Sequence, residues 1–232
     1  MKRPEIVDGF RMRGAEVTRL ESFSDAVFGF ALTLLVVSLD VPRTYDDLIT
    51  TMHGFPAFAV CFLFLAIIWN SHYKFCRRFG LDDGMTRFLT CVLLFVVLFY
   101  VYPLKFLFNL SITGAFFGHG SAMGLRSREQ FASLLIIYGL GFAAVYFSLL
   151  LLYLHAYRRR AELQLTELER FDTRYLVKRF GVLVGMGLFA AFLARLGWFL
   201  EWTTLVYILL FPILRVSRIV HERKRATYLT GA

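Results

Sequence analysis

The residues best placed to do chemistry stand at the two ends of one apolar segment, which runs from Arg19 to Pro42. Charged side chains beside such a segment are costly in lipid and generally face protein or water. Asp25 lies near its start and Asp40 near its end, with Glu21 and Ser24 close to Asp25. Successive residues of a helix are 100° apart, so an apolar stripe of Phe23, Phe30, Leu34 and Val37 lies on a different face of this segment from Asp25. Taken by itself, such a stripe usually packs against other helices.

Trp69 and His72, on the next apolar segment, are the expected partners of Arg19 and Asp25. Arg19 and Asp25 lie about 120° apart around a helix, so they do not pair directly and each needs another partner. We expect His72 to hydrogen-bond with Asp25 or Arg19 and to act as a structural group.

The other side chains that could do chemistry do not form the pattern of an active site or a metal centre. The five His are scattered among loops and helix ends, and the three Cys lack ligand spacing. An enzyme would need polar catalytic groups gathered at one depth in the membrane. We therefore expect a protein that is not an enzyme and that holds no resident metal or cofactor.

The composition indicates that lipid surrounds much of the chain. Hydrophobic residues make up 58% of the 232 residues and charged residues only 19%, which argues against a soluble domain of this size. The net charge of +9 would favour nucleic acid in a soluble protein. Here the basic residues lie between apolar blocks, so we expect the bilayer, and no nucleic acid, as a partner.

Apolar runs of about 20 residues predict an all-α integral membrane protein with six transmembrane helices per subunit. The expected spans are Ser22–Leu39, Pro56–Tyr73, Phe88–Leu110, Phe131–Tyr157, Leu176–Leu196 and Trp198–Val216. They define an N-terminal arm (1–21), a six-helix transmembrane domain (22–216) and a basic tail (217–232). With these spans, 21 Lys and Arg residues fall on one side of the membrane and four on the other. This bias predicts that both termini are cytoplasmic.

One group of residues resembles the signature of a known family. Arg19-x-x-x-Phe23-Ser24-Asp25 opens an apolar helix that contains Thr33, and Trp69-x-x-His72 follows on the next helix. These residues are similar to the signature of the transmembrane protein 175 family of potassium channels. Single-repeat members of this family are prokaryotic and assemble as homotetramers.

The resemblance implies a pore lined by the first helix of each subunit, without the carbonyl filter of ordinary potassium channels. Its constriction would consist of Phe30, Leu34 and Val37, and the Thr33 hydroxyl would replace part of a cation's hydration shell. The family usually has isoleucine or leucine where this chain has Phe30. Asp40 would lie at the outer mouth, where four carboxylates would concentrate cations; alternatively it is a solvated helix end.

These expectations favour a potassium-permeable cation channel in the cell membrane, with K⁺ as a permeating ion, no cofactor, and further copies of itself as its protein partners. The alternative is a secondary transporter of a cation or a small solute. Lys105, beside Pro103 within the third span, is the feature that favours a transporter. The absence of a detectable internal repeat favours the channel.

Overall fold

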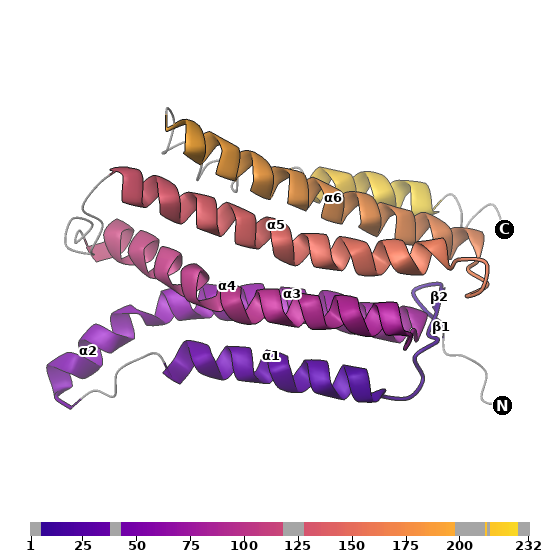
Figure 1. The fold of residues 1–232 in the computed structure, drawn as a ribbon, viewed down its shortest axis with the longest axis horizontal. Helices are drawn as coiled ribbons and strands as arrows, with labels where there is room; N and C mark the ends of the chain where they lie inside the picture. Colours follow the sequence, from indigo (N-terminus) through magenta and orange to yellow (C-terminus); the bar gives the residue numbers. More distant parts are fainter. Residues whose placement is uncertain (1–5, 38–42, 118–127, 198–211, 213, 227–232) are drawn as a thin grey trace.

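The computed structural model describes residues 6–37, 43–117, 128–197, 212 and 214–226. A short antiparallel hairpin precedes the helices, with Ile6 opposite Arg11 and Val7 opposite Phe10. The elements are β1 (Ile6–Val7), β2 (Phe10–Arg11), α1 (Arg19–Val37), α2 (Tyr45–His53), α3 (Phe55–Phe79), α4 (Gly84–Phe117), α5 (Arg128–Arg158) and α6 (Glu167–Leu196). A further helix over 214–226 lies beside α6 (Figure 1).

The predicted number of six membrane spans is wrong for the part of the chain that the structure describes. Four helices, α3 to α6, are long and apolar enough to cross a membrane. The first predicted span corresponds to α1, which is not among these four helices; the residues that follow it, 38–42, lie outside the described part of the chain. Most of the last predicted span, residues 198–211, lies outside the described residues.

Helix ends explain where the other predicted spans were too short. α3 continues to Phe79 and ends at Gly80, whose φ of 58° lies in the left-handed region that glycine adopts readily. α6 begins earlier than predicted because Thr166 and Glu169 form a capping box at its first turn. α2, which was not predicted, starts in the same way at Thr44 and Asp47. Pro103 lies inside α4 without ending it.

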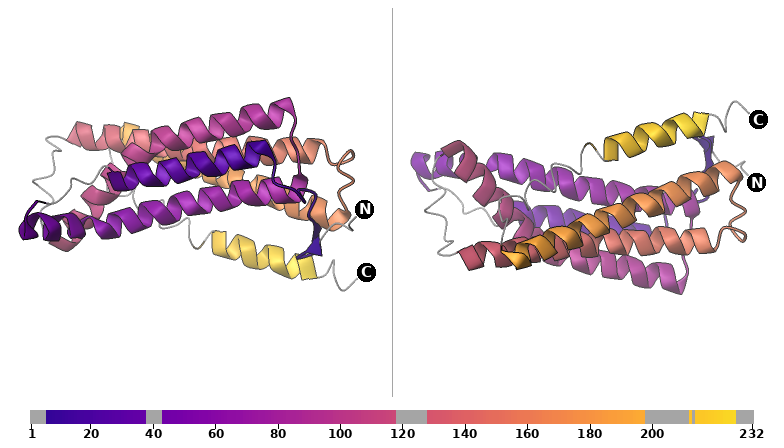
Figure 2. Two further views of the ribbon diagram at one scale, coloured as in Figure 1. Left: turned by 90° about the horizontal axis from the view of Figure 1, so that it is seen from below. Right: turned by 90° about the horizontal axis from the view of Figure 1, so that it is seen from above.

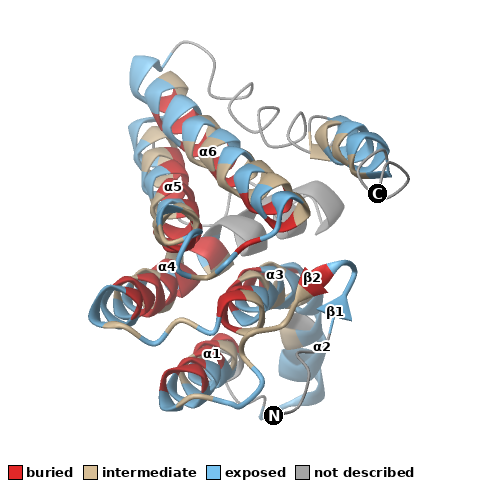
Figure 3. Ribbon diagram, turned by 90° about the vertical axis from the view of Figure 1, so that its right-hand side faces the viewer, coloured by how far each residue is buried: buried red, intermediate tan, exposed pale blue. Residues whose placement is uncertain are grey.

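The long helices run side by side, and each turns a buried face toward its neighbours (Figures 1–3). α5 and α6 approach closely where Gly139 faces Gly187: a Cβ on either glycine would lie within 3.0 Å of the other's carbonyl oxygen. Small residues at a crossing allow two helix backbones to come this close. Aromatic rings fill the neighbouring core; Tyr153 of α5 packs against Phe75 and Phe79 of α3.

The N-terminal arm is folded onto the end of the bundle where α6 begins. The buried carboxylate of Glu169 accepts hydrogen bonds from the backbone N–H of Arg11, at 2.7 Å, and from the guanidinium of Arg13, at 2.8 Å. Arg77 of α3 donates to the carbonyl oxygen of Gly14 at 2.8 Å. These contacts join segments far apart in the sequence, and they fix the start of α1 beside the end of α3.

Candidate ion pathway and its supporting network

α1 has two faces with opposite environments. One is buried against α3 and α4 and consists of Leu20, Glu21, Ser24, Phe28, Ala31 and Leu35. The opposite face is apolar but uncovered: Phe30 is 68% exposed and Phe23 is 53% exposed. On a helix that lies among membrane spans, an exposed apolar face of this kind is a surface for lipid, for another subunit or for an ion path.

The residues predicted to form the constriction fall on this uncovered side as far as the structure describes them. Phe30 and Thr33 are exposed, and Leu34 is half-buried at the edge of the packed face. The Thr33 hydroxyl donates to the carbonyl oxygen of Phe30 at 2.8 Å, so its lone pairs remain free to face a cation. Val37 is the last residue of α1, and its side chain and Asp40 lie outside the described residues.

Asp25 is tied to α3 by a tryptophan. The Trp69 indole Nε1 donates to the Asp25 carboxylate at 2.7 Å, and the Trp69 ring stacks on Tyr73 at a centroid distance of 5.6 Å. The Arg77 guanidinium lies 5.5 Å from the centre of the Tyr73 ring. These contacts connect Asp25 to the end of α3 that is predicted to be cytoplasmic.

A second link between α1 and α3 is an ion pair that was not among the pairings predicted from the sequence. Glu21 and Arg77 are 3.0 Å apart, and the Glu21 side chain is only 4% exposed. The signal was an acid in the first turn of an apolar helix, which needs a cation at the same depth when it is buried. Arg19, by contrast, is exposed and forms no ion pair with any described residue.

Two further signature residues point into the core. The Ser24 hydroxyl donates to the carbonyl oxygen of Leu20 at 2.7 Å, which satisfies a buried hydroxyl within its own helix. His72 does not pair with Asp25 or Arg19 as expected. It is buried between α1 and α4, with Nε2 at 3.4 Å from the Thr90 hydroxyl and its ring 6.3 Å from that of Phe28. Trp69, one turn earlier, occupies the position next to Asp25.

Lys105 has a structural environment that explains its place in an apolar helix. Its ammonium group donates to the carbonyl oxygen of Leu35 at 3.1 Å. Leu35 lies in the last turn of α1, where unpaired carbonyl groups carry the negative end of the helix dipole. The feature that favoured a transporter is therefore also a contact that holds the end of α1 against α4.

No group of three or more His, Cys, Asp or Glu residues comes together to hold a metal ion within the described ranges. The side chains of Glu21, Ser24, Asp25 and Thr33 on α1 each bind backbone or side-chain groups of this chain. The exposed side of α1 therefore combines apolar side chains with the hydroxyls of Ser22 and Thr33.

Three comparisons with known proteins show which family this chain resembles. Residues 19–100 match the model of the family described as endosomal/lysosomal potassium channel TMEM175. A potassium channel of Marivirga tractuosa is 43% identical over 171 residues, which cover 71% of this chain and 69% of the relative. The structure of a threonine-to-alanine variant of the potassium channel MtTMEM175 superposes with a TM-score of 0.83 at 35% identity, covering 94% of this chain and 98% of that one.

A homologue from Chamaesiphon minutus, described as a lysosomal potassium-selective channel TMEM175 homologue, shares the fold with a TM-score of 0.57 at 21% identity, covering 86% of this chain and 96% of that one. The matched family region begins at Arg19 and includes both signature motifs and α1, α2 and α3. The resemblance predicted from those residues is confirmed, and the chain belongs to the TMEM175 family of potassium channels.

Proposed function

We propose that this potassium channel conducts ions along the uncovered face of α1. The observation that carries the proposal is that Phe30 and Thr33 lie exposed on the side of α1 opposite its buried face. Lipid would tolerate the phenyl ring, but Thr33 adds a hydroxyl to the same face. The family to which this chain belongs is a family of ion channels rather than of enzymes.

In this proposal, Phe30, Leu34 and Val37 form a dry constriction. At about 1.5 Å rise per residue, the three layers are separated by about 6 Å and 4.5 Å and span roughly 10 Å. A plug of this kind has no fixed charge, so the preference for K⁺ depends on its width and on the adjacent Thr33 hydroxyl. Asp40 follows the constriction and would concentrate cations at the outer mouth.

One helix cannot enclose a path by itself, so the channel must contain several copies of the chain. Four copies would place four α1 helices around one axis with their uncovered faces inward. We place this homotetramer in the cell membrane with both termini in the cytoplasm, in accord with the excess of Lys and Arg at that side. Cross-linking in mild detergent is expected to stop at four subunits, and a conducting monomer would refute the assembly.

Two leucines of α1 provide a direct test of the conducting face. Leu34→Ser wets the middle layer of the constriction, so conductance is expected to rise and the preference for K⁺ to fall. Leu32 lies at the other edge of the helix and packs against the core. Leu32→Ser is therefore expected to lower stability without raising conductance.

Single-channel recording of both variants in planar bilayers under a K⁺ gradient distinguishes the two faces. Saturable, gradient-coupled uptake in place of unitary currents would contradict a channel. A larger conductance change from Leu32→Ser than from Leu34→Ser would show that a different face of α1 lines the path.

A further inference from the structure

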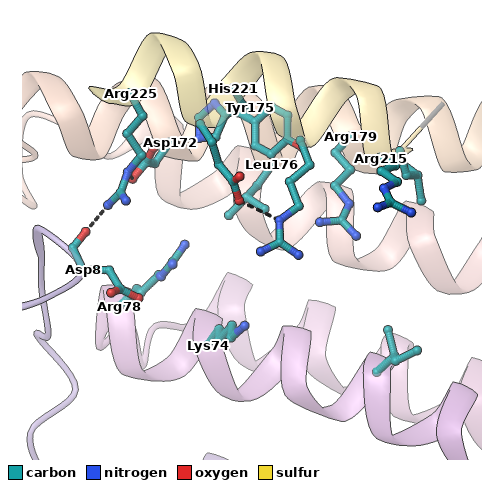
Figure 4. Close-up of a pocket in the computed structure, with 14 residues that line it drawn as sticks. Asp8, Lys74, Arg78, Asp172, Tyr175, Leu176, Arg179, Arg215, His221 and Arg225 are labelled. Carbon is teal, nitrogen blue, oxygen red and sulfur yellow. Dashed lines mark hydrogen bonds and ion pairs between the residues drawn. The ribbon is translucent and has the colours of Figure 1, made fainter. Parts of the chain in front are cut away.

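A basic cavity of about 810 Å³ lies away from α1, between α3, α6 and the helix over 214–226 (Figure 4). Six Lys or Arg side chains and three carboxylates line it. Two of the cations are neutralised within the wall: Arg225 lies 3.0 Å from Asp172, and Arg218 lies 2.7 Å from Glu222. The cavity thus has more positive charge than its own carboxylates balance.

With the third carboxylate, Asp8, the cavity keeps an excess of three positive charges, which four side chains on three helices share. Lys74 and Arg78 belong to α3, Arg179 to α6 and Arg215 to the helix over 214–226, and none forms an ion pair with a described residue. Arg78 also lies over the Phe10 ring, 4.9 Å from its centre. Figure 4 shows the two cations of α3 across the cavity from the other two. Cations gathered around one space repel each other unless an anion lies between them.

The wall also contains a hydroxyl that lacks a hydrogen-bond partner within the described residues. The Tyr175 hydroxyl oxygen is buried, and its ring stacks on His221 with centroids 3.8 Å apart. His221 in turn bonds to Asp172 at 2.9 Å, so the tyrosine is held in place. Leaving a buried hydroxyl unpaired is costly, and a phosphate oxygen would accept its hydrogen bond.

The basic cavity adjoins an apolar one. A second pocket of about 450 Å³ shares Lys74, Arg78 and Arg179 with it and extends between α3, α5 and α6. Its other walls are largely apolar, lined by Phe64, Phe142, Tyr146, Phe180 and Leu183. A charged mouth above an apolar pocket matches a molecule with an anionic head and a hydrocarbon chain, and it does not match a free inorganic anion.

We propose that this pair of cavities binds one anionic phospholipid per subunit. The phosphate lies among Lys74, Arg78, Arg179 and Arg215 and accepts a hydrogen bond from Tyr175, and one acyl chain enters the apolar pocket. Basic pockets between membrane helices at the cytoplasmic face are typical sites for such headgroups. The site would fasten the helix over 214–226 to α3 and α6, and it does not depend on which face of α1 conducts.

Native mass spectrometry of the full-length channel tests the site directly. Phosphatidylglycerol, phosphatidylcholine with the same chains, and glycerol phosphate are titrated against the purified protein. Phosphatidylglycerol is expected to bind selectively, and glycerol phosphate is expected not to displace it. The double variant Lys74→Gln/Arg179→Gln is expected to weaken phosphatidylglycerol binding about 10- to 30-fold.

The matched control is Arg158→Gln/Arg170→Gln, which removes two exposed charges from the same end of the bundle but outside both cavities. It is expected to change binding less than about twofold, since screened surface charge contributes little. If the Lys74/Arg179 variant does not stay assembled, Arg215→Gln provides the same test, with a loss of about fivefold. Equal binding of phosphatidylcholine, displacement by glycerol phosphate, or equal losses in the control would overturn the proposal.

Discussion

Glu169 is the residue at which one substitution should most weaken the attachment of the N-terminal arm. Its side chain is 1% exposed and accepts hydrogen bonds from the backbone N–H groups of Arg11 and Thr166, at 2.7 and 2.9 Å. The Arg13 guanidinium adds a charged contact at 2.8 Å. Glu169→Ala therefore removes the acceptor of two N–H groups and the counter-charge of a partly buried cation.

The loss of stability in Glu169→Ala depends on how many of the groups that donate to Glu169 keep another acceptor. Removing one partner of a buried ion pair costs about 3–5 kcal/mol. Arg13 keeps the carbonyl oxygens of Leu163 and Arg11 as acceptors, so the lower end of that range applies, about 3 kcal/mol. For a chain of this size, that loss lowers the unfolding temperature by about 6–12 °C.

The assay is thermal unfolding of the purified channel in mild detergent, followed by tryptophan fluorescence. The matched control is Glu167→Ala, which removes the same side chain two residues earlier, where it is exposed and contributes only to the helix dipole. Its expected cost is about 1 kcal/mol or less. The reasoning is refuted if Glu169→Ala unfolds within about 2 °C of the wild type, within roughly 0.5–1 kcal/mol, or if Glu167→Ala loses as much.

The remaining predictions concern three other contacts. Gly187→Ala places a methyl group 2.9–3.0 Å from backbone atoms of α5 and is expected to lower the free energy of unfolding by about 1–3 kcal/mol. Gly185→Ala meets nothing within 4 Å and is expected to stabilise α6 by about 0.5–1 kcal/mol. Equal melting temperatures of the two variants would contradict this prediction. Trp69→Phe removes the donor to Asp25 and is expected to cost about 1–2 kcal/mol and to reduce the assembled fraction in gel filtration; an unchanged profile and stability would show that the bond is dispensable. Burial lowers the pKa of His221 from 6.5 although Asp172 opposes the shift, so the folded state binds fewer protons and stability falls as the pH decreases below 6.5; His221→Phe should remove that part of the pH dependence, and an unchanged slope would contradict the assignment.

The sequence by itself determined the class of protein, its family and much of its helical pattern. Long apolar runs separated by basic loops leave few alternatives to membrane helices, because lipid cannot satisfy an exposed backbone. The signature from Arg19 to Asp25 identified the family, and the period of the first helix placed Phe30 away from Asp25. These properties are local, since they depend on residue types within a few helical turns.

The number of spans and the partners of the charged residues were decided only by the tertiary structure. Four helices of the described residues have the length and hydropathy of a span, and residues 38–42 and 198–211, which belong to or follow the first and last predicted spans, lie outside that part of the chain. Pairings such as Glu21 with Arg77, and Trp69 instead of His72 with Asp25, depend on how α1 and α3 are rotated about their axes.

The same holds for the basic cavity. Its cations are separated by more than 100 residues in the sequence, from Lys74 to Arg179 and Arg215. In the sequence, each of these cations is only one more positive charge at the predicted cytoplasmic face. They come together because Gly139 and Gly187 let α6 pack closely against α5, and because the sandwich of His221 between Phe171 and Tyr175 holds the last helix against α6. Helix rotation and crossing are set by the sum of many side-chain contacts across the bundle, and no local pattern encodes that sum.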